Sequence, residues 1–191
     1  MLTLAEIGPA LYGAWRLAHL DPDGMRYFDR SITGFWRSFR VSVLAAPFWI
    51  IILAVGLGPL PATGGWFRFV VAETIGYVIL WVAFPLAAFY LTFLTDRQRE
   101  YFVFITALNW ASLIQLSVQM PAHVLASLPL MPAGRGVILI GAADLAALFY
   151  EWFITRTALR LSGFGAVGFV VVDFLIGSVV NSVAVWEAYL N

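Results

Sequence analysis

The sequence predicts an all-α, polytopic membrane protein with five transmembrane helices and an N-terminal amphipathic helical arm. Of the 191 residues, 62% are hydrophobic and 12% are charged. A water-soluble domain with that balance would have too little polar surface to cover itself. Five segments are also mostly apolar over the length of about 20 residues that a helix needs to cross a bilayer. These predicted spans are residues 41–57, 67–94, 101–120, 136–155 and 164–190.

Residues 1–40 form the arm, and residues 41–191 form the transmembrane domain. Apolar residues at steps of three and four, from Leu4 through Trp15 to Ala18, predict a first amphipathic helix. Asp21 begins a segment with turn and helix-cap chemistry. A second helix is predicted to carry an aromatic face opposite an arginine-rich face, which suits a helix lying at the lipid headgroups. The arginines expected to bind headgroups or a partner are Arg26, Arg30, Arg37 and Arg40. Packing of both helices beneath the bundle is the alternative, and it is compatible with headgroup contact.

The distribution of arginine predicts the orientation of the chain. All eleven cationic residues are arginine, which is typical of a GC-rich bacterial genome. Nine lie in the arm and in the second and fourth loops, while Arg68 and Arg135 lie on the other side. Cytoplasmic segments near the spans carry an excess of Lys and Arg. We therefore expect a bacterial inner membrane protein with a cytoplasmic N-terminus and a periplasmic C-terminus.

Proline and glycine indicate where the spans bend, end or pack. Pro85 should kink the second span and free the carbonyl group of Trp81 from its helical hydrogen bond. The segment 121–132 contains three prolines and is predicted to be a surface or re-entrant loop. Small residues recur in the last span and predict a face for close helix packing. They are Gly163, Gly165, Gly168 and Gly177.

Polar side chains inside the spans are the candidate functional residues, because placing them in hydrocarbon is costly. At 1.5 Å per residue, Asn109 and Asp173 lie about 12 to 13 Å from the ends of their spans. Asp144 lies eight positions from the opposite end, so the three are expected near one central layer. Two interpretations stay open: a site for a proton or a cation, and interhelical hydrogen bonds among neutral acids and amides. The full predicted cluster is Glu73, Asn109, Asp144, Asp173 and Asn181.

Glu151 lies two helical turns after Asp144 and shares its helix face. Because it stands near Arg156, we expect an ion pair between these two residues at the end of the fourth span.

Several classes of chemistry lack their residues. The sequence has no cysteine, which excludes thiol catalysis and cysteine-ligated metals. His19 and His123 are predicted on opposite sides of the membrane and cannot form one metal site. No metalloprotease, serine hydrolase or Walker motif is present. We therefore expect no enzymatic activity, no cofactor and no metal, and the net charge of zero gives no bulk attraction to nucleic acid.

The predicted layout resembles the Yip family of Ypt-interacting proteins and its bacterial relatives. Members of that family have a cytoplasmic N-terminal arm, five closely spaced helices and an external C-terminus. The family's Asp-Leu-Tyr-Gly-Pro type signature is not present, and the tetrapeptide Glu6-Ile7-Gly8-Pro9 is only a faint echo of it. No functional residue of the family can be carried over. The resemblance implies a non-enzymatic organiser of membranes.

We therefore expect an accessory or scaffolding subunit that contacts the lipid bilayer and packs with other membrane proteins or with itself. The alternative is a proton- or cation-coupled transporter, or a subunit of one, that uses the buried acids.

Overall fold

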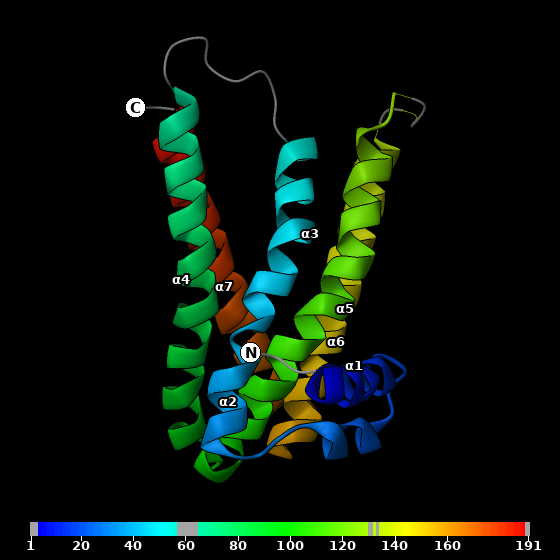
Figure 1. Cartoon of the computed structure of the whole chain (residues 1–191), viewed down its shortest axis with the longest axis vertical. Coiled ribbons are helices and arrows are strands. Elements are labelled where there is room, and N and C mark those ends of the chain that lie inside the picture. The colour runs from blue at the N-terminus through cyan, green and yellow to red at the C-terminus, as the bar shows by residue number, and fades with distance from the viewer. Residues whose placement is uncertain (1–3, 57–64, 130–131, 133, 190–191) are drawn as a thin grey trace.

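A computed structural model describes residues 4–56, 65–129, 132 and 134–189, and within those ranges the chain is helical and contains no strand. Figure 1 shows long helices running side by side, with the N-terminal arm lying across one end. We call this the arm end of the bundle and the opposite one the far end. The elements are α1 (Leu4–Ala18), η1 (Pro22–Tyr27), α2 (Ile32–Ser38), α3 (Val41–Gly56), α4 (Gly65–Leu94), η2 (Gln98–Glu100), α5 (Tyr101–Ser127), α6 (Arg135–Leu159) and α7 (Gly163–Tyr189).

The helices confirm the predicted all-α fold class. Five stretches of the described chain are long and apolar enough to cross a membrane. Each overlaps one of the five predicted spans, although the predicted ends at Leu57 and Leu190 lie outside the described residues. The five stretches are Ile32–Gly56, Trp66–Leu94, Gln98–Ser127, Arg135–Leu159 and Gly163–Val183.

Two helices continue beyond their predicted C-terminal ends. α5 continues through Pro121 to Ser127, so the loop expected from residue 121 begins later. A proline removes only one helical donor, and neighbouring helices compensate for the loss in apolar surroundings. Here Gln119 Nε2 donates to Asp144 Oδ1 at 2.9 Å and joins this turn of α5 to α6. α6 itself runs to Leu159, four residues beyond its predicted end, which moves Glu151 away from the helix terminus.

The long helices pack as two groups that meet at the arm end. α4 lies against α7, while α5 lies between α3 and α6, and α6 and α7 form an antiparallel hairpin. Figure 1 shows the α4–α7 pair and the α5–α6 pair close together near the arm and diverging toward the far end. The most deeply buried side chains accordingly lie in the arm half of the bundle, among them Phe104, Ile105, Ile154, Leu159 and Phe169.

The arm packs against the bundle through small residues of α1. Ala10, Ala14 and Leu17 are buried against α5 and α6, whereas Trp15 is 55% exposed. Of the predicted apolar stripe, Ile7, Leu11 and Ala18 are partly buried against the core, and Trp15 is the member that faces outward. Small side chains let the α1 backbone approach the bundle closely, and the Tyr150 hydroxyl of α6 donates to the Ala14 carbonyl oxygen at 2.6 Å.

The second predicted helix of the arm is divided into η1 and α2. Asp21 Oδ1 accepts from the Asp23 amide at 3.0 Å and caps η1, at the position where the sequence indicated a cap. The chain is then extended until Ser31, whose Oγ accepts from the Gly34 amide at 3.0 Å and caps α2. Asp29 Oδ1 accepts from the Ser31 amide at 2.8 Å. This local pairing of side chain with backbone competes with a continuous helix.

Candidate functional site

A cavity of about 170 Å³ lies between α4, α5, α6 and α7. Its apolar wall consists of Leu80, Trp81, Phe84, Pro85, Ile105 and Leu108. Five polar side chains face it, three from α5 and one each from α6 and α7: Asn109, Ser112, Gln115, Glu151 and Asp173. Polar groups from three helices that converge on one apolar cavity are typical of a binding site.

Asn109 joins the cavity to the arm. Its side chain is buried, and its Nδ2 donates to Ser38 Oγ of α2 at 2.8 Å. Ser38 is also buried and donates to the Phe35 carbonyl oxygen at 2.7 Å. Ser112 Oγ in turn donates to the Asn109 carbonyl oxygen at 2.8 Å. The hydrogen bond from Asn109 to Ser38 thus links α2 of the arm to a residue that lines the cavity.

The carboxyl groups of Glu151 and Asp173 line the same cavity and interact with one another across the α6–α7 contact. Glu151 is only 5% exposed, and its Oε1 has no hydrogen-bond partner within the described part of the chain. An ionised carboxylate accepts hydrogen bonds but cannot donate one. A hydrogen bond between two carboxyl groups therefore requires a proton on one of them.

The α6–α7 hairpin explains why these two acids meet. Glu151 lies eleven residues before Ser162 in the connection, and Asp173 lies eleven residues after it. In an antiparallel hairpin, residues equally far from the turn come side by side. Trp152 Nε1 donates to the Gly163 carbonyl oxygen at 3.0 Å, which ties the end of α6 to the beginning of α7.

Pro85 shapes the opposite wall of the cavity. Because proline has no amide hydrogen, the carbonyl group of Trp81 lacks its usual helical donor, and both residues line the cavity. The carbonyl group of Pro85 itself accepts from the Tyr101 hydroxyl at 2.9 Å. The wall from α4 therefore contains a proline-induced break in the helical hydrogen-bond ladder.

The structure brings together two members of the predicted polar cluster and separates the others. Asn109 and Asp173 line the cavity. Asp144 lies elsewhere on α6, where it accepts the hydrogen bond from Gln119. Glu73 is partly buried on α4 away from the cavity, and Asn181 is exposed on α7.

The prediction of an ion pair between Glu151 and Arg156 is wrong. Residues five apart on an α-helix point in directions roughly 140° apart, so both cannot face the same neighbour. Arg156 instead places its guanidinium 5.5 Å from the centre of the Trp152 ring, while Glu151 faces α7. Glu151 and Asp173 are equally far in sequence from the turn between α6 and α7. That symmetry, together with the full length of α6, is the signal that could have identified Glu151.

The four arginines expected to bind headgroups lie on the arm, and two of them have acidic neighbours. Arg37 contacts Glu6 at 2.5 Å, and Arg26 contacts Asp23 at 3.0 Å. Arg30 and Arg40 are exposed. In the same region, Arg16 pairs with Asp21, and this hydrogen bond lowers the pKa of the Asp21 carboxyl below its usual value.

Fold and site together define an all-α protein whose long, apolar helices surround a carboxyl pair, with Glu151 buried and Asp173 partly buried. Within the described ranges, no group of three or more His, Asp or Glu side chains is placed to hold a metal ion. Comparison with protein-family models, with curated proteins and with solved structures found no match to this chain. The resemblance to the Yip family stays a prediction drawn from the layout of the helices.

Proposed function

We propose that this is a non-enzymatic membrane protein that couples the binding and release of a proton to transport, alone or as a subunit of a larger transporter. The observation that carries the proposal is the Glu151–Asp173 pair, in which Glu151 is buried and its Oε1 is unpaired among the described residues. Acidic residues within membrane helices are rare and commonly mark proton or ion pathways. Interhelical packing alone would be served by an amide at lower cost.

The depth of the pair supports this function. Glu151 lies eight residues before the end of α6 at Leu159, and Asp173 lies ten residues after the start of α7 at Gly163. At 1.5 Å per residue these positions are about 12 and 15 Å from the helix ends. In a hydrocarbon core of about 30 Å, both carboxyl groups would lie close to the midplane.

The chemistry of the pair is that of a single shared proton. With the proton present, one carboxyl group donates to the other and the pair carries one negative charge. Removal of that proton leaves two adjacent carboxylates, which repel strongly in surroundings of low dielectric constant. Entry of a small cation such as Na⁺ would relieve the repulsion in the same way as a returning proton. The pair can therefore exchange a proton with solvent or exchange it for a cation.

The arm fits the cytoplasmic face of a bacterial inner membrane. Nine of eleven arginines lie at the arm end, as the positive-inside rule requires of the cytoplasmic side. Trp15 and Trp36 of the arm are 55% and 66% exposed, and tryptophan is enriched at the boundary between lipid and water. In this arrangement Arg26, Arg30, Arg37 and Arg40 reach the headgroups, and the N-terminus is cytoplasmic.

The test uses protein in liposomes that carry a pH-sensitive dye inside and are energised by a K⁺ gradient with valinomycin. We expect proton entry to fall to the level of empty liposomes in Glu151→Gln and in Asp173→Asn. Asp144→Asn is the matched control, because Asp144 lies on the same helix as Glu151 but outside the cavity, and it should retain the flux. Wild-type flux in the first two variants, or equal loss in all three, would refute the assignment. A Na⁺ gradient imposed across a second set of liposomes distinguishes cation exchange from proton flux.

An accessory role, packing with other membrane proteins or with a second copy, is the second candidate. It is favoured by α3, which packs mainly on α5 and leaves Val43 73% and Ile50 54% exposed. Figure 1 shows the helix groups diverging toward the far end. Cross-linking and light scattering in mild detergent test this role. If the protein is a monomer in detergent and no membrane protein is cross-linked to it, the accessory role is excluded.

A further inference from the structure

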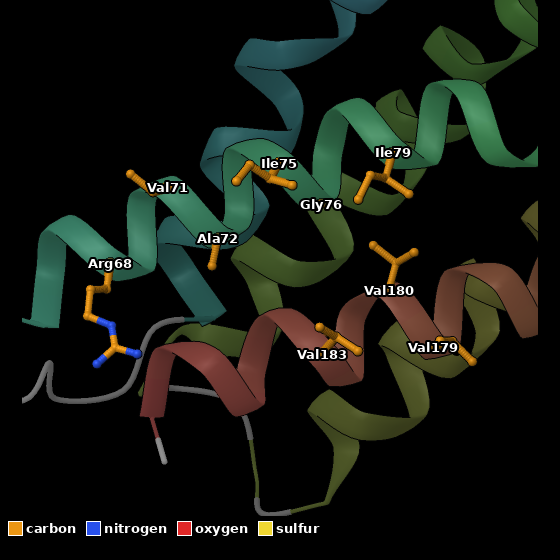
Figure 2. Close-up of a pocket in the computed structure, with 9 residues that line it drawn as sticks. All are labelled: Arg68, Val71, Ala72, Ile75, Gly76, Ile79, Val179, Val180 and Val183. Carbon is orange, nitrogen blue, oxygen red and sulfur yellow. The ribbon is translucent and has the colours of Figure 1, made fainter. Parts of the chain in front are cut away.

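A second cavity, larger than the first and unlike it in chemistry, lies between α4 and α7. Its volume is about 420 Å³. Figure 2 shows it as a groove between the two helices, with Ala72 and Ile79 of α4 facing Val180 and Val183 of α7, and with Arg68 at one end. Apart from Arg68, every residue that lines it is apolar or glycine. An apolar groove with a single cation at its mouth suits a ligand with a long hydrocarbon part and an anionic group.

The spacing of the lining residues makes the groove continuous. Arg68, Ala72, Ile75 and Ile79 follow one another at steps of three and four and so form one stripe along α4. Ala72 is small and lies deeper in the groove, whereas Ile75 and Ile79 are 54% and 43% exposed at its edge. The groove is thus a hollow between branched side chains.

The length of the groove matches one leaflet of a membrane. Eleven residues separate Arg68 from Ile79, which is about 17 Å along a helix at 1.5 Å per residue. Half of a hydrocarbon core is about 15 Å. If α4 crosses the membrane, Arg68 therefore lies at headgroup level at the far end, and the groove runs from there toward the midplane.

We propose that this groove binds a phospholipid, with one acyl chain between α4 and α7 and the phosphate group at Arg68. Arginine binds phosphate through two parallel hydrogen bonds. Arg68 also makes another contact within the chain, and the five N–H donors of its guanidinium allow it to bind more than one partner. The proposal depends on the membrane location and is independent of the proton site.

The test is native mass spectrometry of protein released from detergent, with phosphatidylglycerol added over a range of concentrations. We expect one tightly retained phospholipid in the wild type. Arg68→Gln should weaken its binding roughly tenfold or more, as expected for loss of hydrogen bonds between charged groups. Ala72→Phe, which fills the groove, should abolish it. Arg135→Gln is the matched control, because Arg135 begins α6 at the far end but does not line the groove.

Two outcomes would overturn the proposal. Equal retention by the wild type and by Arg68→Gln, Ala72→Phe and Arg135→Gln would mean that lipid binds nonspecifically around the helices. A dimer that carries no phospholipid and is lost in Ala72→Phe would assign the groove to a second copy of the chain. Diacylglycerol, which has the acyl chains but no phosphate, should bind wild type and Arg68→Gln equally. Should Ala72→Phe fail to fold, the comparison of Arg68→Gln with Arg135→Gln still decides the question.

Discussion

Replacing Ser38 by alanine removes the hydroxyl group that accepts a hydrogen bond from Asn109 Nδ2 at 2.8 Å. Both side chains are buried, at 1% and 6% exposure, so water cannot replace the lost partner without a rearrangement. A buried donor left unpaired costs about 1 to 3 kcal/mol. Interhelical hydrogen bonds in membrane proteins measure nearer 0.6 kcal/mol and reach about 1.7 kcal/mol. We expect Ser38→Ala to lower the free energy of unfolding by about 1 to 2 kcal/mol, because both side chains are buried.

The measurement is reversible unfolding in mixed detergent and SDS micelles, followed by tryptophan fluorescence. Ser42→Ala is the control, because Ser42 Oγ donates to the Phe39 carbonyl oxygen at 2.7 Å just as Ser38 donates to Phe35. Ser42→Ala should lower the free energy of unfolding by less than Ser38→Ala does. A double-mutant cycle with Asn109→Ala should give a coupling of about 1 kcal/mol. Strictly additive effects of the two substitutions would refute the link between arm and cavity.

Two further predictions concern the arm. Gly13→Ala should loosen α1 from η1 and lower the unfolding free energy by about 1 to 3 kcal/mol, because a Cβ at Gly13 would lie 2.9 Å from the Gly24 carbonyl oxygen. Gly8→Ala meets no atom within 4 Å and should be neutral or stabilising, so equal losses would contradict the packing. The hydrogen bond from Arg16 lowers the pKa of the Asp21 carboxyl. The stabilisation of the folded state by this bond should therefore be complete above about pH 4, and it should be lost as the pH falls further and Asp21 is protonated. Thermal unfolding of Asp21→Asn should lack that part of the acid dependence, and identical pH profiles for variant and wild type would contradict it.

Helix positions could be predicted because each span carries its own signal. A run of apolar residues long enough for a bilayer does not depend on its neighbours, so all five long helices were predicted. The error at Pro121 has a tertiary cause. The last turns of α5 pack on α6, where Gln119 donates to Asp144, and a breaker residue alone does not reveal such a partner.

The arm shows a similar limit. Its apolar periodicity predicted helices, yet Trp15 faces outward while Ala10 and Ala14 face the bundle. Periodicity identifies large apolar residues, whereas close packing on α5 and α6 selects small ones. The division of the second helix follows from local hydrogen bonds of Asp29 and Ser31, whose capping chemistry is present in the sequence.

The candidate site was predicted in part. Depth alone placed Asn109 and Asp173 in one layer, and both line the cavity. Depth could not indicate that Asp144 points to Gln119 or that Asn181 is exposed, because that depends on how each helix is rotated about its axis. Glu151 was misplaced because the end of α6 was set four residues too early.

The sequence by itself determined the all-α class, the five long apolar helices and the set of polar side chains that hydrocarbon would have to accommodate. These properties follow from composition and from spacing along one helix. Only the tertiary structure decided that Glu151, and not Asp144, is the partner of Asp173, and that α4 and α7 leave a groove beneath Arg68. The rotation and pairing of helices depend on how side chains far apart in the sequence fit together, and no single segment contains that information.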